Sequence, residues 1–67
     1  MPSSVIQYFS YDQQKGTLKI AFVSGTVYFY KNVPKEIYDA LKIAGSKGRY
    51  FHFFIRDKYE FDKVDEP

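Results

Sequence analysis

The chain of 67 residues contains no cysteine and no tryptophan, and it has a single histidine, His52. Without cysteine, neither a disulfide nor a thiolate-bound metal can form. One histidine cannot complete a zinc or haem site, so we expect no metal and no cofactor. No apolar run approaches the roughly 20 residues that span a bilayer, and the first residues do not resemble a signal peptide. The sequence therefore predicts a cytoplasmic protein with no membrane partner.

Residue patterns typical of catalysis are also scarce. The sequence has no cysteine nucleophile and no serine in a nucleophile-elbow motif. Most of its eight carboxylates lie within residues 57–67, beside lysines that would pair with them. Asp39 and His52 could serve as an acid–base pair, but no spacing requires it. We therefore expect no catalytic residues and no enzymatic activity.

Aromatic residues, by contrast, are abundant, with seven Tyr and seven Phe. A chain of this length lies near the lower limit for folding without disulfides or metals. Each aromatic side chain can bury about 150–250 Å², so most of them are needed in the core. We expect a single domain over residues 1–67, with an ordered core over about residues 4–64 and frayed ends.

The formal charge of +2 is unevenly distributed along the chain. Residues 1–56 hold eight Lys and Arg against three Asp and Glu, whereas residues 57–67 hold two Lys against five Asp and Glu. A basic body with an acidic tail is compatible with binding a polyanion such as RNA.

Three segments are predicted to form the strands of an antiparallel meander: residues 5–11, 17–23 and 27–31. In the second segment, Leu18, Ile20 and Phe22 alternate with other residues, so these three mark the face that packs on a core. Ser24 and Gly25 supply the turn into the third segment.

The register of that turn decides which of the aromatic residues 28–30 are buried. A two-residue loop at residues 24–25 places Ile20 opposite Phe29 and leaves Tyr28 and Tyr30 outside. A three-residue loop centred on Gly25 places Ile20 opposite Tyr30 and leaves Phe29 outside. One residue of slip therefore exchanges the two faces.

Two helices are predicted to follow. Pro34 favours a first helix start, apolar residues recur at helical spacing through Ile43, and Gly45 ends the helix. Ser46 is a favourable N-cap for the second helix.

The apolar residues of the second helix fall on one side, which leaves His52, Phe53 and Arg56 toward the flank or the solvent; they are Tyr50, Phe51, Phe54 and Ile55. Residues 59–64 predict a terminal extended segment that packs back. The fold class is thus α+β, a three-stranded antiparallel β-meander followed by two helices packed on its inner face.

The start of the second helix is a candidate anion site. Unpaired N–H groups and the helix dipole attract anions there, and Gly48 lets a phosphate approach the backbone. Lys47 and Arg49 add positive charge, and Arg56 lies about two turns further on. The alternative interpretation is a capped junction whose Gly48 lies under a bulky neighbour.

His52 and Phe53 each allow two interpretations. His52 is either a polar residue on the helix flank or a side chain that stacks on a base or donates to phosphate. Phe53 is either covered by the C-terminal segment or exposed as a contact for a partner.

Together these residues resemble the KTSC domain family over about residues 3–61. The family's Tyr-x-Tyr falls on Tyr28 and Tyr30, and its Ser-x-Gly-x-Tyr-Phe begins at Ser46. The family is named for its occurrence at the C-terminus of some lysyl-tRNA synthetases, and its function is not established. The residue between the tyrosines is usually polar, whereas here it is Phe29, and the position of His52 is often Asn. The resemblance implies that Tyr28 and Tyr30 are buried and Phe29 is exposed.

The leading hypothesis is a non-catalytic accessory module that binds RNA or another polyanion. Phosphates would be contacted at the start and end of the second helix, by Lys47, Gly48, Arg49 and Arg56. Bases would stack on His52 and on an exposed aromatic, either Phe29 or Tyr30. The alternative is a module that binds another protein or a second copy of itself, through Phe29 and Phe53 or through the edge strand at residues 5–11.

Overall fold

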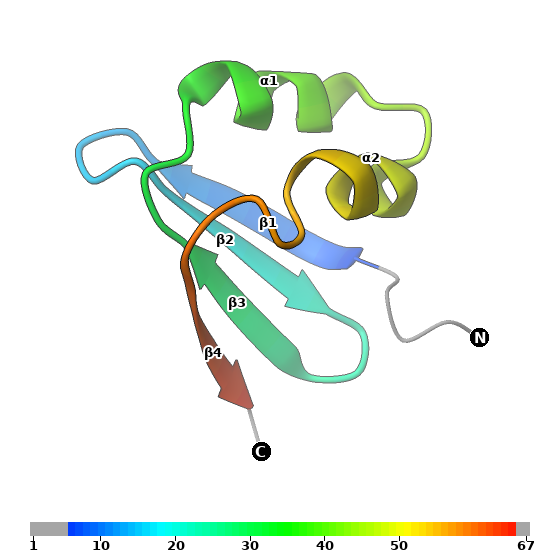
Figure 1. The fold of residues 1–67 in the computed structure, drawn as a ribbon. Coiled ribbons are helices and arrows are strands. Elements are labelled where there is room, and N and C mark those ends of the chain that lie inside the picture. Colours follow the sequence, from blue (N-terminus) through cyan, green and yellow to red (C-terminus); the bar gives the residue numbers. More distant parts are fainter. Residues whose placement is uncertain (1–5, 66–67) are drawn as a thin grey trace.

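The computed structural model describes residues 6–65. Its elements in chain order are three strands, two helices and a fourth strand (Figure 1): β1 (Ile6–Asp12), β2 (Thr17–Phe22), β3 (Thr26–Tyr30), α1 (Lys35–Ile43), α2 (Lys47–Phe54) and β4 (Phe61–Asp65). The predicted start of the core at residue 4, the predicted strand start at residue 5 and the fraying expected at the two ends of the chain lie outside the described residues.

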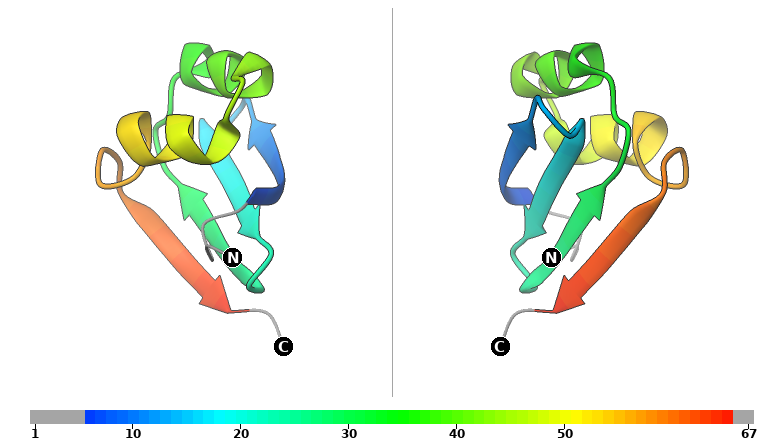
Figure 2. Two further views of the ribbon diagram at one scale, coloured as in Figure 1. Left: turned by 90° about the vertical axis from the view of Figure 1, so that its right-hand side faces the viewer. Right: turned by 90° about the vertical axis from the view of Figure 1, so that its left-hand side faces the viewer.

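The four strands form one antiparallel sheet in the order β1-β2-β3-β4. The prediction of three strands was therefore wrong in number. The extended segment expected near the C-terminus contains most of β4, and β4 pairs with every residue of β3, from Tyr30 with Phe61 to Thr26 with Asp65. Both helices lie on the same face of the sheet (Figures 1 and 2), and no helix of residues 6–65 covers the other face.

The hairpin between β2 and β3 confirms the face predicted for the tyrosines, although the residue pairing differs and only Tyr30 is buried, whereas Tyr28 is partly buried. Ile20 lies opposite Tyr28 and Leu18 opposite Tyr30, because residues 23–25 form the loop. The pairing is displaced by two residues from the one predicted for a three-residue loop centred on Gly25. A displacement of two residues leaves every side chain on its face. Tyr28 and Tyr30 therefore share the helix-covered face, and Phe29 lies on the opposite one.

The core lies between the sheet and the two helices. It contains four buried side chains from β2 and β3 and four from the segments that follow: Leu18, Ile20, Phe22, Tyr30, Val33, Leu41, Phe51 and Ile55. Phe51 of α2 packs edge-to-face on two aromatic rings of the sheet, with centroid distances of 5.2 Å to Phe22 and 5.6 Å to Tyr30. Such pairs add to the free energy of apolar burial.

The helix boundaries follow the predicted signals. Pro34 precedes α1, which ends at Ile43, and the Ser46 Oγ accepts a hydrogen bond from the Arg49 N–H at 3.3 Å. Neither helix is long and apolar enough to cross a membrane. The predicted burial of Phe54 was wrong, because its side chain is 53% exposed. The Phe54 ring stacks on the Tyr50 ring, with 4.7 Å between the ring centroids.

Helical geometry explains the exposure of Phe54. The side chains of Phe51 and Ile55 fix the direction of α2 that faces the core. Phe54 lies about 100° around the helix axis from Ile55, beyond Phe51. It therefore reaches the flank of α2 rather than the core.

Phe51 and Phe53 provide a matched test of this packing, because they lie in the same helix and differ in exposure. Phe51→Ala should lower the free energy of unfolding by about 3–5 kcal/mol, since it removes a buried ring and leaves a cavity. Phe53→Ala should change it by less than about 0.5 kcal/mol, because Phe53 is 59% exposed. Urea denaturation measures both values, and similar losses in the two variants would contradict this placement of α2.

Candidate nucleic-acid interfaces

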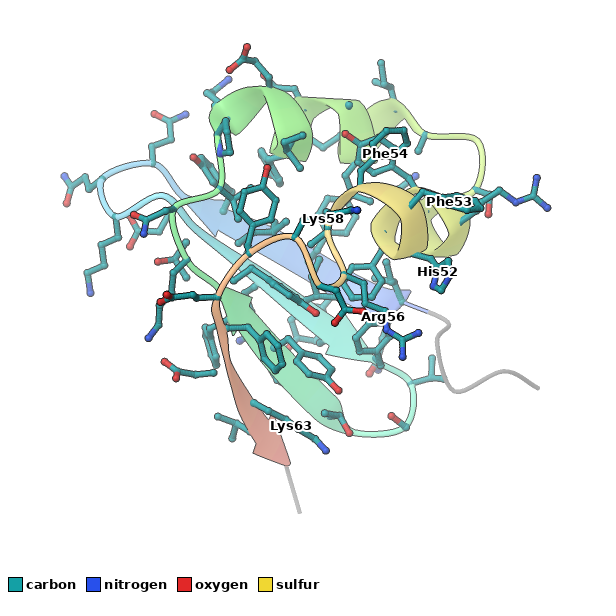
Figure 3. All side chains as sticks on the ribbon, viewed as in Figure 1. His52, Phe53, Phe54, Arg56, Lys58 and Lys63 are labelled. Carbon is teal, nitrogen blue, oxygen red and sulfur yellow. The ribbon has the colours of Figure 1, made fainter. Side chains whose placement is uncertain are left out.

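One outer face of α2 carries basic side chains. Arg49 and His52 are three residues apart on one stripe of α2, and Arg56 follows in the turn just beyond the end of the helix. All three are exposed, and an Arg56 Nη lies 3.5 Å from the His52 Nδ1. We call these three residues the α2 surface. Figure 3 shows His52 and Arg56 next to each other below α2.

Lys47 and Gly48 do not belong to this stripe. The Lys47 Nζ donates a hydrogen bond to the Ala44 carbonyl oxygen at 3.4 Å, so its charge lies against the end of α1. Lys47 also lies about 200° around the helix axis from Arg49. Gly48 is half-buried in the first turn. The structure thus brings Arg56 together with His52, leaves Arg49 exposed in the first half of α2, and directs Lys47 of the predicted anion site toward the end of α1.

Aromatic rings of the sheet lie on the same side of the molecule as α2. The ring centroids of Tyr28 and Phe61 lie 5.4 Å apart, and Phe61 is 44% exposed. Lys63 pairs with Tyr28 across the strands and is exposed. Asp57 is the acidic neighbour, with an oxygen 4.0 Å from the Arg56 Nε. A cationic helix face and half-exposed rings therefore lie on one side of the sheet.

Tyr30 cannot serve as the exposed stacking residue that the sequence allowed. Its side chain is 2% exposed, because it packs beneath Phe51. Burial raises the pKa of the Tyr30 phenol above its ordinary value of 10.0; the neighbouring Tyr28 and Asp57 raise it further, and Arg56 opposes them. Tyr30 is thus a neutral core residue, and its expected role in base stacking was wrong.

The opposite face of the sheet carries the other predicted aromatic, Phe29. One row across the four strands consists of Ser10, Lys19, Phe29 and Asp62. The Lys19 Nζ lies 5.8 Å from the centroid of the Phe29 ring and 5.3 Å from that of the Tyr8 ring. These distances are typical of cation–π contacts.

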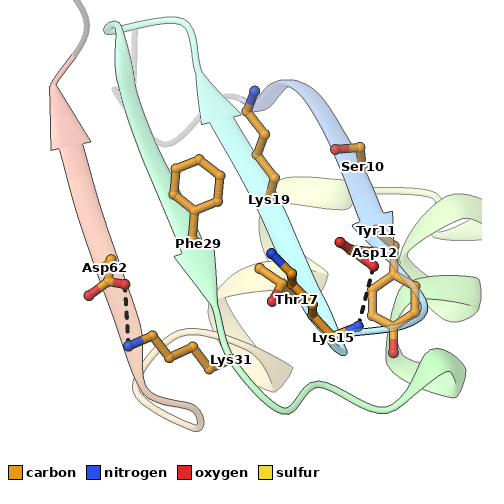
Figure 4. A pocket seen from close by; sticks show the side chains of 9 residues that line it. All are labelled: Ser10, Tyr11, Asp12, Lys15, Thr17, Lys19, Phe29, Lys31 and Asp62. Carbon is orange, nitrogen blue, oxygen red and sulfur yellow. Dashed lines mark hydrogen bonds and ion pairs between the residues drawn. The ribbon is translucent and has the colours of Figure 1, made fainter.

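A shallow depression of about 410 Å³ lies around Phe29 on this face (Figure 4). We call it the sheet-face depression; its lining residues are Ser10, Tyr11, Asp12, Lys15, Thr17, Lys19, Phe29, Lys31 and Asp62. The lysines come from the β1–β2 turn, β2 and the end of β3. Sequence reasoning missed them as a group, because strand alternation gives the face of a side chain but not its neighbours on adjacent strands.

Phe53 is exposed, as one of its two interpretations required. Its ring meets the His52 ring edge-to-face at 5.3 Å. The C-terminal segment instead pairs with β3 and leaves this part of α2 uncovered (Figure 1). Phe53 and Phe54 are therefore two exposed rings on α2.

The fold defines a small α+β domain in which two helices, inserted between the third and fourth strands of a meander, cover one face of the sheet. The KTSC domain model matches residues 2–59, and this chain belongs to the KTSC domain family. The crystal structure of a KTSC domain protein from Yersinia pestis superimposes with a TM-score of 0.87 at 33% identity, covering 96% of this chain and 90% of that one.

The relatives include both large enzymes and small proteins. A lysine–tRNA ligase from Nostoc punctiforme is 46% identical over 61 residues, which cover 91% of this chain and 11% of the ligase. An uncharacterized protein from Stutzerimonas stutzeri is 35% identical over 66 residues, which cover 97% of this chain and 93% of that protein. The chain thus spans about the full length of some relatives and a small part of the ligases.

The burial of Tyr30 predicts a pH dependence of stability. As pH rises past about 10, the unfolded chain releases the phenol proton of Tyr30 while the folded chain retains it, so stability falls. Tyr30→Phe removes this proton, and the variant should lose less free energy of unfolding than the parent between about pH 9 and 11. Chemical denaturation across this range measures the difference, with Tyr8→Phe as the same change at an exposed ring. An unaltered slope in Tyr30→Phe would show that the phenol is accessible to solvent.

Proposed function

We propose that this chain is a non-catalytic accessory module that binds RNA, with the α2 surface contacting the phosphate backbone. The observation that carries the proposal is that Arg49, His52 and Arg56 are all exposed at the outer side and end of α2, with an Arg56 Nη 3.5 Å from the His52 Nδ1. Arginine presents several N–H donors in a planar fork that fits phosphate oxygens. His52 adds a further N–H donor and, when protonated, a further positive charge.

The ion pairs of the chain leave the α2 surface available to a polyanion. Among the described residues, Arg49 has no carboxylate within 4 Å, and Arg56 approaches Asp57 only at that limit. In contrast, Lys35 and Lys42 of α1 both pair with Asp39, at 3.1 Å and 3.4 Å. When cationic side chains bind phosphates, they release the counterions condensed on the nucleic acid. This release supplies most of the non-specific affinity. The α2 surface is therefore better suited to phosphates than the surface of α1.

The relatives supply context for RNA as the polyanion. A segment similar to this chain is part of lysine–tRNA ligases, which are named for a reaction on tRNA. An appended domain with a cationic helix face can add affinity for the same nucleic acid by raising its local concentration. This support is an analogy of context and carries no catalytic role to the chain.

A second candidate function is binding of another protein or of a second copy through exposed apolar residues. Phe53 and Phe54 both project from α2, and Ile43 at the end of α1 is largely exposed. Aromatic anchors of this kind are enriched at protein interfaces. Apolar association weakens little with ionic strength, whereas phosphate contacts weaken steeply, so salt distinguishes the two functions.

RNA binding through the α2 surface predicts a specific loss of affinity. Arg49→Ala with Arg56→Ala should weaken binding of a fluorescently labelled RNA hairpin. It should also reduce the slope of log K against log salt concentration by about 2, because about one counterion is released per phosphate contact. Fluorescence anisotropy at several salt concentrations measures both effects.

The matched control is Lys35→Ala with Lys42→Ala, which removes the same formal charge from α1. This variant should keep most of the affinity and the slope. Equal losses in the two double variants would show that net charge alone, and not the α2 surface, attracts the RNA. Absence of binding by the parent at low salt would overturn the proposed function.

The second candidate is tested by the oligomeric state. If the exposed rings mediate self-association, Phe53→Ser with Phe54→Ser should lower the average mass measured by light scattering at high protein concentration. A parent chain that is monomeric over the whole dilution series would rule out the homodimer.

A further inference from the structure

The open face of the sheet has the features of a second nucleic-acid contact. We infer that the sheet-face depression binds an unpaired base of single-stranded RNA, with Phe29 as the stacking ring and the surrounding lysines as phosphate contacts. This inference rests on the proposed function and adds the ligand class, a single strand, and a second surface.

The rings on this face are partly accessible to solvent. Phe29 is half-buried near the end of β3, and Tyr8 of β1 is exposed. Lys19 lies on β2 between them, with its ammonium near both rings. An exposed cation–π contact is weaker than the stacking of a base on an aromatic side chain. A base can therefore displace the Lys19 ammonium from Phe29, and the flexible side chain can then reach a phosphate.

The charges around Phe29 favour an anion. Three lysines and two aspartates line the depression, which gives it a formal charge of +1. Asp62 is paired with Lys31 at 3.2 Å. Asp12 Oδ1 accepts hydrogen bonds from the backbone N–H groups of Gln14 and Lys15, at 3.0 Å and 3.2 Å.

Two of the lysines are available to a ligand. Among the described residues, no carboxylate lies within 4 Å of the side-chain ammonium group of Lys15 or of Lys19. Both can therefore contact a phosphate without breaking an ion pair. The hydroxyl groups of Ser10 and Thr17 line the same depression and add neutral hydrogen-bonding groups.

The strand register arranges this face in rows, which orients the ligand. An apolar row near the β2–β3 hairpin contains Tyr8, Ala21, Val27 and Val64. The next row contains Phe29 and Lys19, and the polar residues Asp12 and Thr17 lie beyond it toward the β1–β2 turn. Figure 4 shows Lys15 and Lys31 on the same side of Phe29, so a nucleotide placed with its base on Phe29 can direct its phosphate toward them.

The geometry selects a single strand over a duplex. Phe29 lies in the sheet surface and does not project, so only a base whose flat face is free can stack on it. In an RNA duplex the bases are stacked on one another and their faces are covered. The depression of about 410 Å³ lies within the range of about 300–1,000 Å³ that is typical of small-ligand sites. One nucleotide with an unpaired base fits a site of this volume, whereas a double helix does not.

The test compares two probes on the full 67-residue chain: a labelled eight-nucleotide single-stranded oligouridine and an RNA duplex of the same length. Phe29→Leu keeps an apolar side chain and removes the aromatic face, so it should weaken binding of the single strand by about five-fold or more. It should leave duplex binding unchanged. Lys19→Gln removes a charge without altering the ring, and it should reduce the salt dependence of single-strand binding.

The matched control is Phe53→Leu, the same substitution at an exposed ring on the helix side. It should bind the single strand like the parent chain, and dispersed amide NMR spectra confirm that each variant folds. If Phe29→Leu and Lys19→Gln both bind the single strand like the parent while the α2 double variant does not, the sheet face is no binding site and the proposed function stands. If the parent binds neither probe at low salt, both proposals fail.

Discussion

Phe51 packs against the rings of Phe22 and Tyr30 on the inner face of the sheet, and this contact fixes the position of α2 and the faces of β3. These edge-to-face contacts, at 5.2 and 5.6 Å, hold α2 over β2 and β3. With Phe51 directed inward, His52 on the neighbouring side of the helix is left in solvent. With Tyr30 directed inward, strand alternation turns Phe29 to the open face. One aromatic cluster thus determines both candidate surfaces.

Much of the fold could be predicted from local patterns. The alternation of Leu18, Ile20 and Phe22 with other residues and the N-cap at Ser46 predicted the correct fold class, the inner face of β2 and the start of α2. The spacing of apolar residues predicted the inward direction of Phe51 but not the exposure of Phe54. The fourth strand could not be predicted in the same way, because β4 is short and polar and includes Asp62 and Lys63. Its strand character comes from hydrogen bonds to β3, which is distant in sequence.

The candidate sites were predicted less completely, for a related reason. Helical spacing correctly placed His52 and Arg56 on an outer face, but it did not show that Lys47 turns to the end of α1. Alternation showed only that Phe29 and the two tyrosines lie on opposite faces, and the family resemblance favoured Phe29 on the open one. The lysines beside Phe29, such as Lys19, became neighbours only through pairing between strands. Contacts between elements are set by register and helix docking, which local patterns do not specify.

We propose that RNA binds to the α2 surface, which consists of Arg49, His52 and Arg56. Chemical-shift mapping of the backbone amides, during titration of the whole chain with an RNA hairpin at low and at high salt, tests it most directly. We expect the amides of residues 49–56 to shift at low salt, and the shifts to shrink as salt is added, because phosphate contacts are released by competing ions. Amides of α1 should move less. No movement in residues 49–56 at low salt, or shifts confined to α1, would contradict the claim.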